Sequence, residues 1–109
     1  MVKEAFDKIL LDAVDGALAS LGDSARQAIY FHLENKFKVV KKEIPDHLEG
    51  FEAGLEKIFG VGAKFIEILI MKKLYERVGQ PLEWDENKQL DFVGYVATAR
   101  KAFLKSEKN

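Results

Sequence analysis

The stretch FIEILIMKKL, residues 65–74, is nearly continuous apolar sequence in a chain whose other segments are amphipathic and highly charged. In a helix, at about 100° per residue, Ile66, Ile70 and Leu74 share one face, and other apolar side chains cover the rest of the cylinder. A helix that spans a bilayer needs about 20 apolar residues, and Glu67 interrupts this shorter run. We therefore expect a central helix that protein surrounds on most sides, either within this chain or with a second copy.

Composition limits both the fold and the function. The chain has 109 residues and is 48% hydrophobic, which is enough for one domain with one core. Lys and Arg total 17 against 18 Asp and Glu, so the net charge is -1 and there is no overall attraction to nucleic acid or anionic lipid. The absence of cysteine excludes disulfides, thiol catalysis and thiolate metal sites. The charged fraction, 32%, is a balance associated with proteins that work at high temperature.

The first residues, MVKEAFDKILLDAV, place acids among the apolar positions. A signal peptide instead has a basic start followed by an uninterrupted apolar stretch. We therefore expect a cytoplasmic protein that does not associate with membranes.

Glycine and proline divide the chain into helical segments. The pattern predicts five helices, over residues 2–21, 24–37, 45–59, 63–78 and 85–105, and a frayed tail over 106–109. Ser24 and Gln27 have the spacing of a capping box for the second helix. Pro45 suits the first turn of the third helix, and Asp85 can cap the fifth. The expected fold is all-α, a single domain over 1–109 with about five helices around the central helix at 63–78.

Catalytic motifs are absent from the sequence. It contains no phosphate-binding loop, dinucleotide-binding or zinc-protease motif. His32 falls on the apolar side of its helix, which favours a hydrogen-bonded core histidine over a catalytic one. His47 lies near Asp46 and Glu49, but a metal site normally needs three or more well-placed ligands, so solvent exposure is favoured. We therefore predict no enzyme activity, catalytic residue, cofactor or metal.

The third helix carries features of a protein interface. Glu49, Glu52 and Glu56 fall on one flank, where they could face a basic partner, although acids also favour the N-terminal half of any helix. Gly50 and Gly54 have GxxxG spacing. This spacing indicates either close approach by another helix or tolerated flexibility.

Two aromatic residues outside the third helix are further interface candidates. Phe31 lies on the polar side of the second helix, so it is either covered by another segment or free for a partner. Trp84 lies in the longest linker, where it either pins the linker to the core or anchors an interface.

A basic cluster between the second and third helices supports an alternative. It consists of Lys36, Lys38, Lys41 and Lys42, with apolar residues between them. These side chains could contact phosphate groups. A solvated connector is favoured, because the cluster has no arginine and the net charge is close to zero.

A set of helix ends, caps and core positions lies between residues 18 and 78: Leu21-Gly22-Asp23-Ser24, Ala28-Ile29-Tyr30, Leu33-Glu34, Glu43-Ile44-Pro45, Ile58-Phe59-Gly60 and Gly62-Ala63. This set resembles a family of small, largely uncharacterised archaeal helical proteins related to Nitrosopumilus-type output domains, which are effector modules of archaeal signalling chains. The resemblance implies an archaeal, cytoplasmic, all-helical domain with no established catalytic residues. The two flanking helices lie outside it.

These observations lead to a non-enzymatic protein-interaction or regulatory module. Its expected partner is another protein or a second copy of itself, so a homodimer is one expected form. The alternative is a nucleic-acid-associated protein that uses the lysine cluster.

Overall fold

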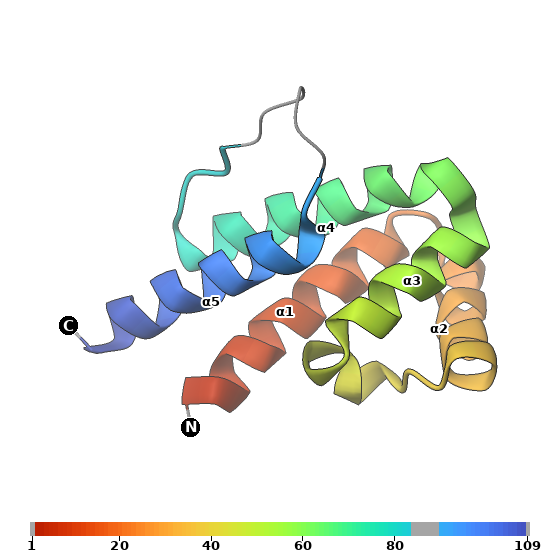
Figure 1. Ribbon diagram of the computed structural model, residues 1–109, viewed down its shortest axis with the longest axis horizontal. Coiled ribbons are helices and arrows are strands. Elements are labelled where there is room, and N and C mark those ends of the chain that lie inside the picture. The colour runs from red at the N-terminus through yellow and green to blue at the C-terminus, as the bar shows by residue number, and fades with distance from the viewer. Residues whose placement is uncertain (1, 84–89, 109) are drawn as a thin grey trace.

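The computed structural model describes residues 2–83 and 90–108, and this part of the chain contains helices and no strand (Figure 1). Five α-helices follow one another: α1 (Val2–Ala19), α2 (Asp23–Phe37), α3 (Leu48–Phe59), α4 (Ala63–Val78) and α5 (Phe92–Lys108). Two 3₁₀ turns, η1 (Lys41–Asp46) and η2 (Gly60–Gly62), lie before and after α3. The predicted all-α bundle is confirmed.

Glycine ends α4 where the sequence predicted. Gly79 has φ 72°, in the left-handed region that costs glycine little. Its N–H donates to the carbonyl of Glu76, and the N–H of Gln80 donates to that of Tyr75. These two hydrogen bonds satisfy carbonyls that the last turn would otherwise leave unpaired, which is why the helix stops here.

Two predicted helix starts are wrong. Ser24 does not cap α2, because the helix already includes Asp23, and Gly22 precedes it without a side-chain cap. The Asp23 carboxylate instead accepts a hydrogen bond from Gln27 within the first turn. Pro45 lies in η1 and not in the first turn of α3, because His47 has φ -135° and ψ 47° and interrupts the helical backbone.

The start of α5 also differs from the prediction. Asp85 lies outside the described residues, and residues 90 and 91 are not helical. Asp91 acts as the cap, since its Oδ1 accepts a hydrogen bond from the N–H of Gly94 at 3.0 Å. The sequence predicted that this helix ends at residue 105 with a frayed tail over 106–109, and α5 continues through Lys108.

The core is built around two helices, α1 and α4, which pack along each other (Figure 1). Small residues on α1 allow this close approach: Gly16 lies against the side-chain stem of Lys73. α1 also contacts α2, η1 and α5, and α4 also contacts α3, η2 and α5. The core therefore has two central helices, where the sequence predicted one.

The chain itself covers most of α4, as expected, and leaves one part of its surface open. Ile66, Ile70 and Leu74 are buried as predicted, together with Met71 and Tyr75. Phe65, in contrast, is 76% exposed.

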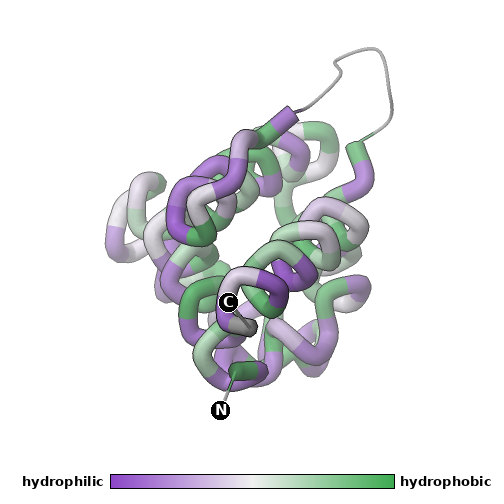
Figure 2. Tube along the Cα trace, turned by 90° about the vertical axis from the view of Figure 1, so that its left-hand side faces the viewer, coloured by the Kyte–Doolittle hydropathy of each residue, from purple (hydrophilic) through white to green (hydrophobic). Residues whose placement is uncertain are grey.

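Along the chain, hydrophobic and hydrophilic segments alternate within most helices, as amphipathic helices require (Figure 2).

Aromatic contacts hold α3 and α5 to this core. The fully buried rings of Phe51 on α3 and Phe92 on α5 have centroids 6.1 Å apart, and Phe6 lies 5.8 Å from Phe103. Such pairs add to the stabilisation from apolar burial.

Within the described residues, every helix is too short or too polar to cross a membrane.

Candidate functional site

Three glutamates from two helices meet at one place on the surface. Glu52 and Glu56 are four residues apart on α3 and so share a face, and Glu67 comes from α4, which packs against α3. One carboxylate oxygen from each lies within 4.8 Å of the other two. They border a hollow of about 360 Å³ that Lys64, Leu90 and Asp91 complete. We call these three residues the carboxylate cluster.

Glu67 is the unusual member of the carboxylate cluster. It is 3% exposed, and its Oε2 has no hydrogen-bond partner among the described residues. Burial, followed by the charges of Glu52 and Glu56, raises the pKa of Glu67 to about 7, while Lys64 acts in the opposite direction. Ionisation of a buried carboxyl is costly, because burial has removed the hydration that would stabilise the charged form.

Glu52 experiences a weaker form of the same effect. Partial burial, followed by the charges of Glu56, Asp91 and Glu49, raises its pKa. The site is therefore a concentration of negative charge that only Lys64, among the residues bordering the hollow, offsets.

The sequence predicted part of this arrangement. Glu49, Glu52 and Glu56 were expected on one flank of the third helix, and the last two do converge, while Glu49 is exposed and lies outside the hollow. Glu67 was missed, because it counted only as an interruption of an apolar run. The available signal was its position directly beside Ile66, on the side of the helix that carries the buried residues.

The glycine pair on α3 packs within the chain. A Cβ on Gly54 would lie 2.6 Å from Cδ2 of Leu33 and 3.3 Å from Cδ2 of Phe37, both on α2. A Cβ on Gly50 would lie 3.3 Å from Cγ2 of Val39. Close approach by another helix is thus the correct explanation for Gly54, and that helix is α2. As a buried residue, Gly54 offers no surface to a partner.

Phe31 is separate from the other interface candidates. It is 62% exposed, and it lies two residues from Leu33, or about 200° around α2, so it faces away from α3. Its ring contacts that of His32 edge-on, with the ring centroids 5.8 Å apart.

Two other predicted residues are settled differently. Trp84 lies outside the described residues. His32 is half-buried, and its Nδ1 has no hydrogen-bond partner in the described structure, which departs from the hydrogen-bonded core histidine that was predicted.

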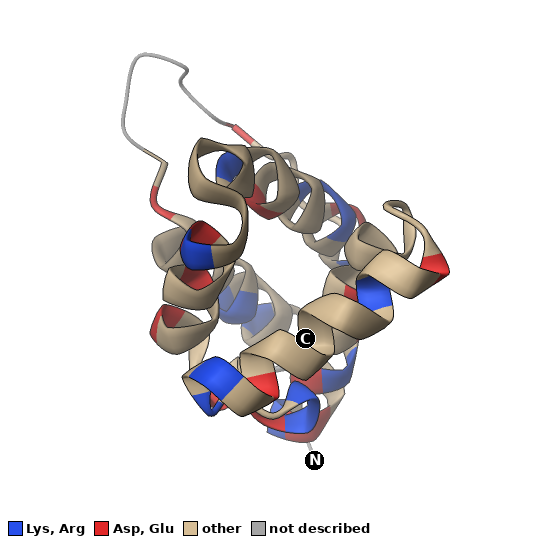
Figure 3. Ribbon diagram, turned by 90° about the vertical axis from the view of Figure 1, so that its right-hand side faces the viewer, with Lys and Arg blue, Asp and Glu red and all other residues tan. Residues whose placement is uncertain are grey.

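The lysine cluster is divided by its local contacts. Lys41 pairs with Asp15 at 3.4 Å and lies over the ring of Tyr30, 4.8 Å from its centroid. Lys38 occupies a left-handed backbone position with φ 59°, and its Nζ donates to the carbonyl of Asn35. Lys36 and Lys42 are exposed. Basic and acidic segments are interspersed on the face shown in Figure 3.

Asp15 joins three elements through a polar network. Its carboxylate accepts hydrogen bonds from Nη1 of Arg26 at 3.2 Å and from the Tyr30 hydroxyl at 2.9 Å. Partial burial opposes ionisation of Asp15, but the Tyr30 hydrogen bond, Lys41 and Arg26 outweigh it and lower the pKa. Burial and the Asp15 hydrogen bond raise the pKa of Tyr30.

Replacing Asp15 with Asn is expected to lower the free energy of unfolding at neutral pH by about 1 kcal/mol, with allowance for partial exposure. Because the pKa is lowered on folding, this stabilisation is present above the ordinary pKa of 3.8 and disappears as the pH falls through the folded-state value. Urea unfolding of D15N and of the exposed-site control D46N measures it. Equal losses in the two variants would contradict the network's role.

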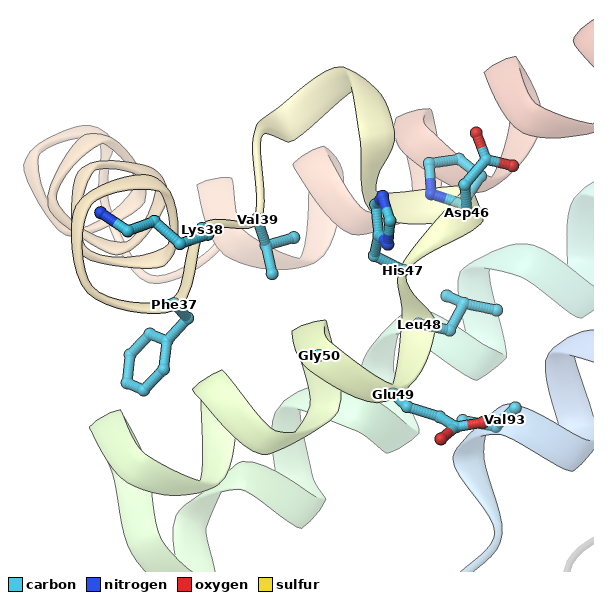
Figure 4. Close-up of a pocket in the computed structure, with 10 residues that line it drawn as sticks. Phe37, Lys38, Val39, Asp46, His47, Leu48, Glu49, Gly50 and Val93 are labelled. Carbon is cyan, nitrogen blue, oxygen red and sulfur yellow. The ribbon is translucent and has the colours of Figure 1, made fainter.

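A hollow of about 440 Å³ lies between the end of α2, η1 and the starts of α3 and α5 (Figure 4). Its lining includes Phe37, Lys38, His47, Glu49 and Val93. In Figure 4 the polar ends of Lys38, His47 and Glu49 point in different directions. General acid–base chemistry requires groups that converge on one reacting atom, and these three do not.

Another hollow, of about 480 Å³, lies where α3 meets α4. Its apolar lining is Ala53, Gly60, Val61 and Ala63, and its charged lining is Glu56, Lys57 and Lys64. Val61 is 88% exposed, and Phe65, one helical turn further along, is 76% exposed. An apolar hollow therefore lies next to two protruding apolar side chains. We call this surface the η2 edge.

Comparisons with models of known protein families, with curated proteins and with solved structures found no match. The resemblance to the archaeal helical family stays a prediction of the sequence.

Proposed function

We propose that this protein is a non-enzymatic interaction module that pairs with a second copy of itself through the η2 edge. The observation that carries the proposal is the exposure of Val61 and Phe65 beside the hollow between α3 and α4. Exposed large apolar side chains that lie together mark interaction surfaces more often than isolated ones do.

The η2 edge suits a symmetric contact. In a twofold dimer the same surface is used by both copies, so a protruding group on one must fit a recess on the other. Phe65 protrudes, and the neighbouring hollow has small apolar residues in its lining, among them Ala53, Gly60 and Ala63. An aromatic side chain buried in such a recess is a typical interface anchor.

The charges around the η2 edge also fit a second copy. The rim carries Glu56 together with Lys57 and Lys64. A rim with both signs is self-complementary, because a lysine of one copy can pair with the glutamate of the other. A strongly basic or acidic partner would instead meet a like charge.

This proposal modifies the interface expected from the sequence. Of the predicted residues, Glu56 borders the η2 edge, whereas Gly54 is buried and Phe31 lies on another helix. The cytoplasmic location and the archaeal, heat-adapted origin remain expectations of the sequence. Nucleic-acid binding is not proposed, because Lys41 is already paired with Asp15.

Replacing Phe65 with Ser is expected to weaken self-association about tenfold or more, because the side chain would lose its apolar burial in both copies. Light scattering over a dilution series measures the molar mass of wild type and F65S. Since Phe65 is exposed in the single chain, far-UV circular dichroism should show an unchanged fold.

The matched control is Phe31→Ser, which removes a second exposed phenylalanine on α2. The proposal requires that F31S still self-associates like wild type. A wild type that stays monomeric at all concentrations, or a dimer that F31S disrupts and F65S does not, would refute it.

A further inference from the structure

We propose that the carboxylate cluster is a binding site for one divalent cation that prefers oxygen ligands, such as Ca²⁺ or Mn²⁺. The three ligands are Glu52 and Glu56 from α3 and Glu67 from α4. Glu56 and Lys64 border both this hollow and the η2 edge, whereas Glu52 and Glu67 border this hollow and not the lining of the η2 edge.

The spacing of the carboxylates fits a single ion. Metal–oxygen distances for hard divalent cations are about 2.0–2.5 Å, so two ligands on opposite sides of one ion lie about 4–5 Å apart, and adjacent ligands lie closer. One oxygen from each glutamate lies within 4.8 Å of the other two. The three oxygens are therefore close enough to converge on one ion through small side-chain rotations.

The burial of Glu67 distinguishes this cluster from ordinary surface acids. Glu67 is 3% exposed and borders the hollow, and its Oε2 has no hydrogen-bond partner among the described residues. A buried carboxylate oxygen needs a donor or a cation to offset its lost hydration. Glu52 and Glu56, its neighbours in the cluster, offer no hydrogen-bond donor when they are ionised, so a divalent cation bound between the three carboxylates would offset their charges together.

The remaining groups around the hollow narrow the kinds of metal ion that could bind there. Asp91 adds a fourth carboxylate at the edge, although its Oδ1 already caps α5. Lys64 is the cationic side chain that borders the hollow, and it must move aside or remain at the rim when an ion enters. Carboxylate oxygens alone suit Ca²⁺, Mg²⁺ and Mn²⁺, whereas Zn²⁺ and Cu²⁺ favour nitrogen and sulfur ligands. The other coordination positions are left to water from the open side.

Titration calorimetry of the EDTA-treated, dialysed chain with CaCl₂ and with MnCl₂, at a pH of about 8, tests the site. We expect saturable binding of one ion per chain for at least one of the two salts. We also expect saturating ion to raise the midpoint of thermal unfolding, because the ligands come together only in the folded chain.

Variants locate the ion. Glu67→Gln and Glu52→Gln each remove one ligand charge at almost constant size, and each should weaken binding about tenfold or more. Glu76→Gln is the matched control, because this glutamate is exposed on the same helix as Glu67 and lies outside the hollow. E76Q should bind like wild type.

Three results would overturn the inference: no saturable binding to wild type, unchanged affinity in both E67Q and E52Q, or an equal loss in E76Q, which would indicate attraction to net charge alone. E52Q keeps the test decisive if E67Q alters the fold, because Glu52 is only half-buried. Electron paramagnetic resonance of Mn²⁺ gives a second readout, since bound and free Mn²⁺ have distinguishable spectra.

Discussion

Replacing Glu67 with Gln is expected to raise the free energy of unfolding by about 2–3 kcal/mol at a pH of about 8, measured with EDTA present. The pKa of this carboxyl rises from 4.5 to about 7 on folding. A group whose pKa rises on folding stabilises the protein fully below the unfolded value, and this stabilisation is lost as the pH increases through the folded value. Wild type should therefore lose stability between about pH 4.5 and pH 7 on account of Glu67, and E67Q should not.

Urea unfolding followed by circular dichroism across this pH range measures the difference. Near pH 4.5 the protonated carboxyl and the glutamine amide are similar in size and both neutral, so the two proteins should converge there. Glu76→Gln is again the matched control and should follow the wild-type pH dependence. If E67Q showed the same loss of stability as wild type between these pH values, the buried charge would not be its source.

Replacing Gly54 with Leu is expected to lower the free energy of unfolding by about 2–3 kcal/mol, even though leucine is the better helix former by about 1 kcal/mol. Its Cβ would lie 2.6 Å from Cδ2 of Leu33, which real Cβ contacts do not tolerate, and the rest of the side chain would meet Phe37. Leu33 is fully buried and cannot swing into solvent. Leu33 must therefore repack within the core or α2 and α3 must separate, and either change lowers stability.

Gly50→Ala is the matched substitution for G54L, on the same face one turn earlier. Its Cβ would lie 3.3 Å from Cγ2 of Val39, a tight contact with one methyl group. We expect G50A to change stability by less than about 1 kcal/mol, because the helix-propensity gain offsets this contact. Urea unfolding compares the two. Equal stability of G54L and wild type would show that α2 does not pack closely on Gly54.

The helical pattern of the sequence predicted most of the secondary structure correctly. The errors in the predicted helix boundaries have local causes. Gly60 and Gly79 end helices as expected, at positive φ, whereas α1 ends at Ala19, before the predicted Leu21, and Gly22 instead precedes α2. Pro45 was placed in the first turn of an α-helix, yet it lies near the end of the 3₁₀ turn η1, because its fixed φ suits both kinds of helix. Asp91 was overlooked as a cap, because Asp85, six residues earlier, offers the same type of capping side chain and local spacing does not choose between them.

The interface candidates were predicted less well. Apolar periodicity says which side of a helix is buried, but it does not say what covers that side. Gly54 was correctly marked as a place of close approach, but its neighbour is α2 of the same chain. Phe65 was assigned to an enclosed helix, and the packing of α1, α3 and α5 on α4 leaves it exposed.

The sequence by itself determined the class of fold, the ends of α3 and α4, and most of the residues that enter the core, because these depend on the helical repeat and on the backbone preferences of glycine. Only the tertiary structure decided the rest. It brought Glu67 to Glu52 and Glu56, and it placed Phe65 beside an apolar hollow. Both arrangements depend on how α3 and α4 turn toward each other across η2. Side-chain packing between helices sets that angle, and no local stretch of sequence contains it.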